Sequence, residues 1–224
     1  MTRVVLVVAA HPDDELLGCG GTLAKHLSAG DSVYTLILAT GSTSRESSAL
    51  GGVAALQDAA RRAASALGAQ APEFAGFPDN AMDTVPRLDV IMAVERMREK
   101  VRPDVVYTHY IHDLNIDHRI AHEAVITAFR PLPGAKPVSI YAYETLSSTE
   151  WGATGYGQGF RPNVFVNISN YLSRKLDALA FYNTEMRDPP HPRSFDGVQA
   201  LARLRGMTVG IDLAEAFEAI RLMD

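Results

Sequence analysis

A continuous apolar run from Val4 to Ala10, rich in β-branched residues, constrains the fold of this chain more than any other feature. A strand that is apolar at every position must be buried on both faces, which is typical of the interior of a parallel sheet. A helix over 16–29, a turn at Gly30-Asp31 and a second apolar strand over 33–38 follow. This order predicts a βαβ unit with two parallel strands.

Strands and helices continue to alternate along the chain. The further predicted strands cover 73–77, 103–108, 139–143 and 164–168, and the further predicted helices cover 53–67, 88–100, 118–129, 171–182, 198–205 and 214–222. Two segments rich in Gly and Ser, 41–52 and 147–161, lack an apolar period and are predicted loops. We therefore expect an α/β fold with a Rossmann-like, doubly wound and mainly parallel sheet and helices on both faces. With 224 residues, the chain is long enough for one such domain, which we expect to span 1–224.

Composition and charge exclude several classes of partner. The formal net charge of −5 and the scattered Lys and Arg residues provide no basic patch for phosphates, so we expect no nucleic-acid partner. No apolar segment is long enough for a membrane span, and the run over 4–10 lacks the charged leader of a signal peptide. Cys19 is the single cysteine, which excludes an intrachain disulfide and fits a cytoplasmic location. Any bound metal must therefore use His and carboxylate ligands.

Polar residues crowd the point where the first strand ends. His11, Asp13, Asp14 and Glu15 follow the strand directly, and Pro12 stiffens the turn between them. Open α/β sheets bind their ligands at this carboxyl edge. A catalytic zinc ion takes three protein ligands and keeps one position for water, so His11 and one aspartate supply two ligands while the other aspartate accepts the water's proton. Capping of the next helix explains Glu15 and one aspartate, but it does not explain His11.

A second polar cluster follows the strand that ends at Thr108. Its members are His109, His112, Asp113, Asn115, Asp117, His118 and His122. We expect the third metal ligand from this cluster because it also follows a strand end. His118 and His122 lie one helical turn apart, so a two-histidine pair on a helix is a rival geometry, and spacing alone does not choose. Asp117 is the predicted N-cap of the helix over 118–129, and His109 is assigned a structural position.

The segment Ala10-His11-Pro12-Asp13-Asp14-Glu15, together with Asp117-His118, resembles the motifs of the PIG-L/LmbE-like zinc N-deacetylases. The first motif is highly specific, and weaker matches extend to Ala214-Glu215-Ala216-Phe217. Position by position, the resemblance implies that His11, Asp14 and His118 bind Zn²⁺ or another divalent metal. It implies that Asp13 is the general base. It also implies an N-acylated amino sugar or glycoconjugate as substrate, and assembly into homotrimers or homohexamers.

The chain departs from the family at the second motif. Family members commonly read His-Pro-Asp-His, whereas this chain reads Asn115-Ile116-Asp117-His118. In the family the first histidine helps to stabilise the oxyanion, and the aspartate, here Asp117, orients that histidine. Another donor must replace it: Asn115 offers a neutral hydrogen bond, and His112 or His191 offers a cationic one. We favour His191, because two flanking prolines hold it on a rigid loop.

Substrate recognition is expected from polar and aromatic side chains on the predicted loops and beside the metal. The candidates are Arg45, Asp79, Asn80, His112, Asn115 and Trp151. The predicted reaction is zinc-dependent removal of an N-acetyl or other N-acyl group from an amino sugar or glycoconjugate. The same site would also serve an amidase of another N-acylated small molecule, such as a sugar-thiol conjugate or an N-acylated antibiotic.

Two rival functions belong to other classes. A nucleotide-binding Rossmann protein would use Gly18, Gly20 and Gly21, but Leu23 stands where the phosphate fingerprint needs a glycine. A purely structural zinc site would be closed by four protein ligands, whereas the first motif leaves Asp13 free. Metal analysis and acetate release from N-acetylated sugars would separate these functions from hydrolysis.

Overall fold

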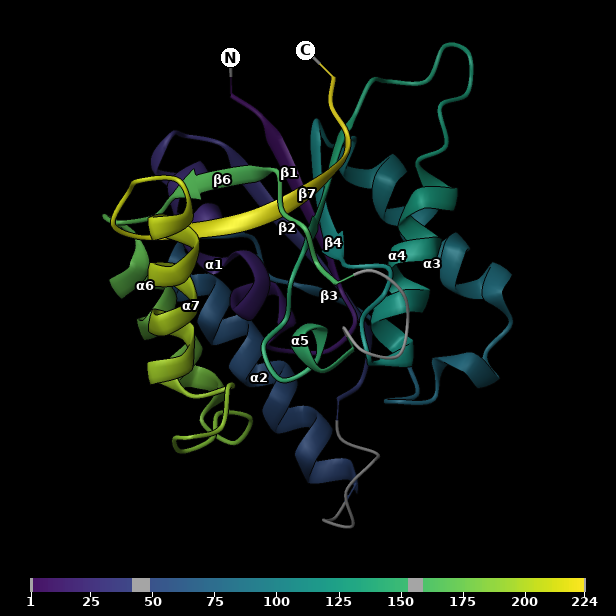
Figure 1. The fold of residues 1–224 in the computed structure, drawn as a ribbon. Coiled ribbons are helices and arrows are strands. Elements are labelled where there is room, and N and C mark those ends of the chain that lie inside the picture. The colour runs from purple at the N-terminus through teal and green to yellow at the C-terminus, as the bar shows by residue number, and fades with distance from the viewer. Residues whose placement is uncertain (1, 42–48, 153–158, 224) are drawn as a thin grey trace.

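The apolar run forms strand β1 (Val4–Ala9) in the interior of a twisted sheet in the computed structural model, which describes residues 2–41, 49–152 and 159–223. Within these residues the strand order is β3-β2-β1-β4-β5-β7-β6. The parallel strands beside β1 are β2 (Ser32–Ala39), β3 (Glu73–Phe77), β4 (Val105–His109) and β5 (Ser139–Tyr143), and the antiparallel edge consists of β7 (Ala214–Arg221) and β6 (Val164–Asn167). The predicted α/β fold with a mainly parallel sheet is confirmed (Figure 1).

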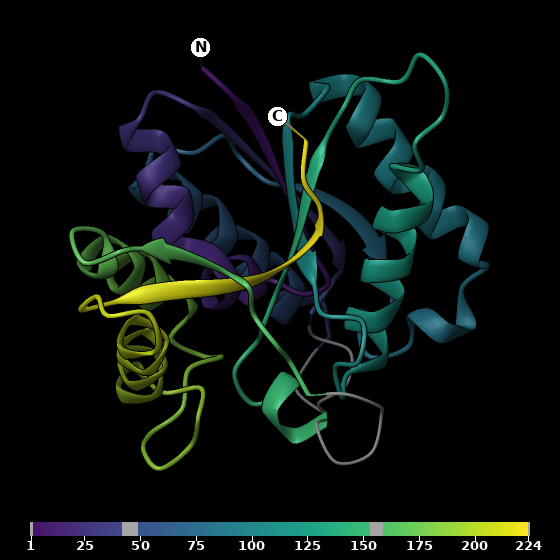
Figure 2. The ribbon, with the colours of Figure 1, turned by 45° about the horizontal axis from the view of Figure 1, so that its top comes forward.

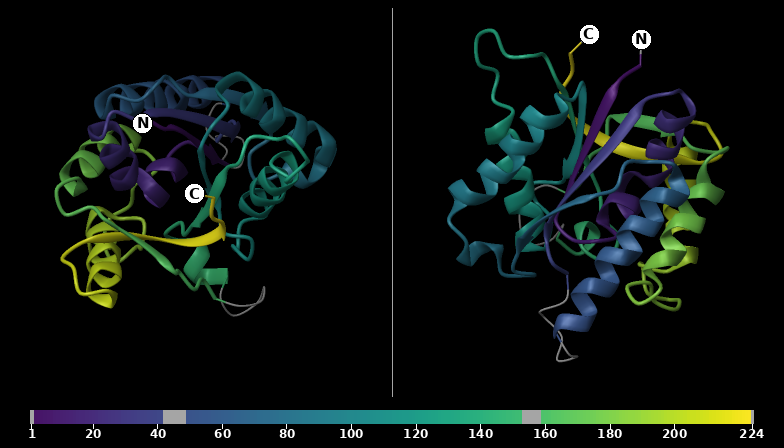
Figure 3. Two further views of the ribbon diagram at one scale, coloured as in Figure 1. Left: turned by 90° about the horizontal axis from the view of Figure 1, so that it is seen from above. Right: turned by 180° about the vertical axis from the view of Figure 1, so that it is seen from behind.

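Helices cover both faces of this sheet (Figure 1 and Figure 3). On one face lie α3 (Arg87–Val101) and α4 (Ile116–Ala128), and on the other lie α1 (Asp14–Ser28), α2 (Ala49–Leu67), α6 (Leu172–Leu179) and α7 (Phe195–Thr208). Short turns of helix form at α5 (Thr149–Gly152), η1 (Met82–Thr84) and η2 (Ala180–Tyr182). Because successive side chains of a strand point to opposite faces, Leu6 and Val8 join the core under α3 and α4, while Val5 and Val7 join the core beside α1. The predicted burial of β1 on both faces is confirmed.

The last predicted helix, 214–222, is wrong. Residues Ala214–Arg221 form β7, which pairs antiparallel with β5 and β6 (Figure 2). Alanine and glutamate favour a helix locally, but Ala216 pairs with Phe165 and Phe217 is fully buried. Burial against the sheet therefore overrides local propensity here.

Several helices begin two to four residues before the predicted start, and the starts of α2 and α4 have identifiable causes. Gly51 and Gly52 favoured a loop in the sequence, because glycine is a poor helix former. In the structure both glycines lie inside helix α2, which begins at Ala49. Helix α4 begins at Ile116, and its N-cap is Asn115 rather than Asp117: the Asn115 side-chain oxygen accepts a hydrogen bond from the Asp117 N–H at 2.8 Å. The Asp117 carboxylate is thereby left for another contact.

Helix α1 is kinked at Cys19, whose φ of −143° interrupts the helical backbone. The second half of the helix therefore has its own amino-terminal N–H groups, and those of Gly21 and Thr22 donate to the Glu215 carboxylate at 2.9 and 2.6 Å. Lys175 of α6 binds the same carboxylate at 2.6 Å. These buried contacts of Glu215 connect β7 and α6 to α1.

Glycine is required at Gly18 by close packing rather than by a phosphate. A Cβ atom there would lie 2.1 Å from the ring of Tyr143, so only glycine lets α1 approach β5 this closely. The glycines that favoured a nucleotide-binding rival thus lie within a packed helix.

The carboxyl ends of the parallel strands meet at the end of the molecule opposite both chain termini (Figure 1). The turn from β1 into α1 and the segment from β4 into α4 both leave the sheet at this edge. Among the described residues, no helix is both long and apolar enough to cross a membrane.

Candidate metal centre

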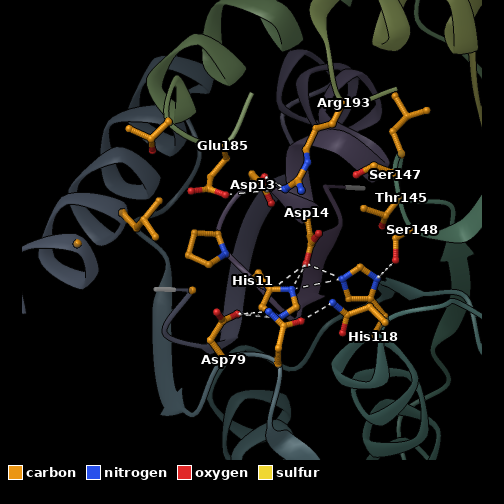
Figure 4. Close-up of a pocket in the computed structure, with 18 of the residues that line it drawn as sticks. His11, Asp13, Asp14, Asp79, His118, Thr145, Ser147, Ser148, Glu185 and Arg193 are labelled. Carbon is orange, nitrogen blue, oxygen red and sulfur yellow. Dashed lines mark hydrogen bonds and ion pairs between the residues drawn. The ribbon is translucent and has the colours of Figure 1, made fainter. Parts of the chain in front are cut away.

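His11, Asp14 and His118 converge at the carboxyl edge. His11 lies in the turn after β1, Asp14 is the first residue of α1, and His118 lies in the first turn of α4. The three ligand atoms form a nearly equilateral triangle: His11 Nδ1 to Asp14 Oδ2 is 3.2 Å, and His118 Nε2 is 3.3 Å from each of them (Figure 4). Ligands about 2.1 Å from a tetrahedral zinc ion lie about 3.4 Å apart, so this triangle fits a zinc ion.

The outer nitrogen of each imidazole faces a carboxylate. His11 Nε2 lies 3.0 Å from Asp117 Oδ2 and 3.3 Å from Asp79 Oδ1, and His118 Nδ1 lies 3.1 Å from Asp113 Oδ1. If the outer nitrogens carry the hydrogens, both inner nitrogens direct a lone pair toward Asp14. Three converging electron pairs on buried atoms are the donor set of a cation site, and carboxylates behind metal-binding histidines are a usual feature of such sites.

Both supporting carboxylates are themselves held in place. Asp117 accepts hydrogen bonds from the backbone N–H groups of Asn80 and Met82 at 2.7 and 3.0 Å. Asp113 accepts hydrogen bonds from the hydroxyls of Ser148 and Thr149. These contacts fix the orientation of the two imidazole rings.

The field of the carboxylates favours positive charge at the triangle. Burial opposes charge on both imidazoles, but Asp117, Asp14 and Asp79 raise the pKa of His11 well above its usual value. Asp14 and Asp113 likewise outweigh burial and raise the pKa of His118 to about 9. A site that stabilises imidazolium in this way also attracts a divalent cation.

Asp13 has the opposite electrostatic character. Burial first, and then the charge of Asp14, raise the pKa of Asp13 well above its usual value, while Arg193 lowers it. Its backbone φ of 107° lies in a region that L-residues rarely adopt, and the Glu15 carboxylate accepts its N–H at 3.1 Å. A carboxyl that is strained and perturbed in a cleft is typical of a functional group.

The triangle and Asp13 open into a cavity of about 360 Å³ (Figure 4). Among the described residues, its wall is formed by the first motif, Gly41, the start of α2, Asp79 and Asn80, the start of α4 with Asn115 and His118, and two later segments. These later segments contribute Thr145, Leu146, Ser147, Ser148, Thr184, Glu185 and Arg193. The cavity is large enough for a small ligand.

The structure does not bring every predicted site residue to this cavity. Asn115 lines it, whereas His112, Trp151 and His191 are not among its described lining residues. The His112 ring packs against Tyr110, and the Trp151 and His191 rings contact each other at 5.7 Å. Arg45 lies outside the described residues.

The rival His118–His122 pair is not formed. His122 Nδ1 donates to the backbone oxygen of His109 at 2.8 Å, so its ring supports the end of β4. His109 is buried, and its ring stacks on His118 with centroids 3.9 Å apart. Burial and the nearby His118 lower the pKa of His109 well below its usual value. The backbone N–H of Ala10 donates a hydrogen bond of 2.9 Å to His109 Nε2.

Sequence reasoning did not assign a role to Arg193 or Glu185. Arg193 Nη1 lies 3.2 Å from Asp13 Oδ2 and 3.9 Å from Glu185 Oε2 (Figure 4). Arg193 and Glu185 lie 180 and 172 residues after Asp13 in the sequence, and neither belongs to a recognisable motif. They reach the cavity only because the chain returns to it in the folded protein. The sole sequence signal was the rigid Pro192-Arg193 loop.

The PIG-L family profile, described as GlcNAc-PI de-N-acetylase, matches residues 6–129, which is more than half of the chain. The chain belongs to the PIG-L family. A diacetylchitobiose deacetylase of Thermococcus kodakarensis is 28% identical over 192 residues, covering 82% of this chain and 70% of that protein. The predicted family is confirmed, and so is the prediction of an enzyme that hydrolyses amide bonds as an N-deacetylase.

Solved structures with this fold do not all have the same activity. The N,N'-diacetylchitobiose deacetylase of Pyrococcus horikoshii has a TM-score of 0.79 at 21% identity, covering 97% of this chain and 84% of that one. A 4-carboxy-2-hydroxymuconate hydratase of Pseudomonas putida also has a TM-score of 0.79, at 22% identity, covering 100% of this chain and 99% of that one. The reaction must therefore be argued from the side chains of the PIG-L site.

Proposed function

We propose that the protein is a zinc-dependent N-deacetylase of an N-acylated amino sugar or glycoconjugate, with Asp13 as the general base. The observation that carries this proposal is the triangle of His11, Asp14 and His118 with Asp13 in the same cavity. Three protein ligands leave a fourth position of a tetrahedral ion for water, which is the arrangement of a catalytic rather than a structural zinc site. The donor set also accepts other divalent metals.

A zinc ion held by these three residues would supply a water of near-neutral pKa and would polarise the acyl carbonyl. Asp13 would accept a proton from the water that attacks the carbonyl carbon. The raised pKa of Asp13 suits this role, because a carboxyl that holds a proton can return it to the nitrogen of the leaving amine. The products are a carboxylic acid and an amine, which ionise to a carboxylate and an ammonium group, and Asp13 ends the cycle ionised.

Other residues of the chain position these groups. Asp117 and Asp113 hold the outer nitrogens of His11 and His118, so the inner nitrogens stay aimed at the metal position. The family resemblance implies that the aspartate at position 117 orients a histidine, but this chain lacks that histidine. Here the Asp117 carboxylate contacts His11 instead. Asn80 and Ser147 line the cavity and offer polar contacts for sugar hydroxyls.

The nature of the acyl group and the rest of the substrate stay open within this proposal. Relatives whose names state a substrate act on GlcNAc-containing compounds, which supports an amino sugar here. An N-acylated small molecule of another class on the same site is the alternative. Assembly into trimers or hexamers and a cytoplasmic location also stay predictions.

Metal analysis and acetate release test the proposal together. The purified protein should bind one zinc equivalent and release acetate from at least one member of a panel of N-acetylated amino sugars, nucleotide sugars and glycoconjugates. Asp13→Ala should keep the metal and lose turnover, whereas His118→Ala should lose both. His26→Ala is the matched control, because His26 lies in the last turn of α1 and pairs with Asp31 away from the cavity.

A protein that folds but binds no divalent metal would overturn the metal site. Turnover retained in Asp13→Ala would overturn the assignment of the general base. Water addition to a carbon–carbon double bond, with no amide hydrolysis, would place the chain with the hydratase of the same fold.

A further inference from the structure

One permanent cation lines the cavity among the described residues. The other basic groups there are His11 and His118, whose inner nitrogens serve the metal position, and the cation is Arg193. Attack on an acyl carbonyl places negative charge on the carbonyl oxygen, and loss of one preorganised donor aimed at such an oxygen lowers kcat about 10²–10³-fold. The cavity therefore needs such a donor if it hydrolyses amides.

The residues at the second motif do not supply this donor. Asn115 occupies the position of the family's histidine, but its side-chain oxygen accepts from Asp117 N–H and its amide donates to Asn80 Oδ1 at 2.8 Å. The His112 ring lies against Tyr110, outside the described lining. His191 accepts the N–H of Arg193 at its Nδ1 and so helps to hold the loop.

Arg193 is held where such a donor is required. Its backbone oxygen accepts the Arg187 N–H at 2.9 Å, and the next residue, Ser194, caps helix α7. The guanidinium lies 3.2 Å from Asp13 Oδ2, the oxygen of the proposed base. Because the water that Asp13 deprotonates must lie about 3–3.5 Å from the acyl carbon, the acyl group lies beside this guanidinium.

One donor of the guanidinium lacks an acceptor. Arg193 Nε is buried and is among three such side-chain atoms without a hydrogen-bond partner in the described part of the chain. Nε itself is therefore not accessible to a ligand, but 22% of the Arg193 side chain is exposed and the residue lines the cavity. The guanidinium carries five N–H donors in a fixed fork, so it can donate to a bound oxygen while it contacts Asp13.

We propose that Arg193 is a catalytic residue that binds the acyl oxygen and stabilises its charge, in place of the histidine that the second motif lacks. The inference rests on the proposed deacetylase function. As the water oxygen bonds to the acyl carbon, the carbonyl π pair moves to the oxygen beside Arg193, and Asp13 takes the water's proton. When the carbon–nitrogen bond breaks, this pair re-forms the carbonyl and the proton passes from Asp13 to the nitrogen. Arg193 transfers no proton.

Kinetics of zinc-loaded variants test the role on the panel substrate that the wild type hydrolyses. Arg193→Ala should lower kcat about 10²–10³-fold with KM nearly unchanged, because the contact strengthens as charge develops. Added guanidinium ion should restore part of this loss, and Arg193→Lys should retain more activity than Arg193→Ala. Arg203→Ala, an exposed arginine of α7, is the matched control and should behave as wild type.

Binding of methylphosphonate provides a readout that does not require turnover. This anion resembles the tetrahedral product of water addition to an acetyl group, and calorimetry on the zinc-loaded proteins should show weaker binding to Arg193→Ala than to wild type or Arg203→Ala. Circular dichroism and thermal unfolding check the fold, and Arg193→Gln serves if the alanine variant does not fold.

Several outcomes would overturn the assignment. Equal affinity of wild type and Arg193→Ala for methylphosphonate would do so, even if no panel substrate is hydrolysed and the proposed function itself fails. A loss confined to KM would assign Arg193 to a remote anionic group of the substrate. A shifted acid limb of the pH profile with an unchanged maximal rate would show that Arg193 only adjusts Asp13.

Discussion

Replacing Lys175 by alanine should remove a large part of the free energy of unfolding, because it leaves a carboxylate buried without its cation. Lys175 Nζ lies 2.6 Å from Glu215 Oε1, and 4% and 5% of the two side chains are exposed. At this distance and an effective dielectric of about 20, the attraction is about 6 kcal/mol, of which desolvation cancels part. Since Gly21 and Thr22 still donate to Glu215, we expect a loss of about 3–4 kcal/mol.

Urea unfolding followed by circular dichroism measures this loss against a total stability of about 5–15 kcal/mol. Lys100→Ala is the control, because Lys100 and Glu73 form an ion pair of 2.9 Å with 65% and 45% of their side chains exposed. Its loss should stay below about 1 kcal/mol. A double-mutant cycle of Lys175→Met and Glu215→Gln isolates the coupling between the two buried groups.

Two results would refute this reasoning. Equal losses in Lys175→Ala and Lys100→Ala would show that burial does not strengthen the pair. Additive effects in the double-mutant cycle would show that the two side chains act independently. If Lys175→Ala does not fold, the methionine and glutamine variants still decide the question, because each retains most of the volume of the residue it replaces.

Three further predictions concern the site and the start of the sheet. Asp13→Gly should be more stable than Asp13→Ala by about 1–2 kcal/mol, because glycine accepts the φ of 107° without strain; both should be inactive, and equal melting curves would contradict the strain. Asp113→Ala should weaken zinc binding about 10–100-fold in chelator competition, because His118 loses its carboxylate partner, and unchanged affinity would contradict that support. Burial opposes the charge of Asp104, but Lys136 and the Val4 N–H lower its pKa, so Asp104 stabilises the fold above the usual carboxyl pKa of about 4 and loses this effect as the pH falls. The stability difference between wild type and Asp104→Asn should therefore shrink in acid, and a difference that is constant with pH would be the contrary result.

The convergence of His11, Asp14 and His118 could be predicted, because these residues follow the carboxyl ends of two neighbouring parallel strands. The apolar run identifies β1 as an interior strand, and the polar residues directly after it must then lie at the carboxyl edge. His118 follows the neighbouring strand β4 in the same way, so its approach to His11 follows from parallel pairing of β1 and β4. The parallel pairing of the two strands thus brings His11 Nδ1 and His118 Nε2, which lie 107 residues apart in the sequence, to a distance of 3.3 Å.

The edge of the sheet could not be predicted, because its stabilising contacts are not local. Residues 214–221 carry alanines and glutamates that favour a helix, yet Glu215 is buried. Its carboxylate is stable there because the kink in α1 exposes two N–H groups and Lys175 supplies a positive charge. No window of sequence around Glu215 contains either partner.

The residues that line the cavity come from two parts of the chain, one inside and one outside the range that the family profile matches. This division is relevant to the choice of substrate. The metal triangle, Asp13 and both supporting carboxylates lie within residues 6–129, the range that the PIG-L profile matches. The facing wall comes from 145–148 and 184–193, which lie beyond that range. In the proposed function the first half supplies the chemistry and the second contacts the remainder of the substrate, so enzymes with this fold can share a reaction and differ in specificity. Arg193 lies in the second half but acts on the acyl group in our proposal, so this wall would contribute to the reaction as well as to substrate binding.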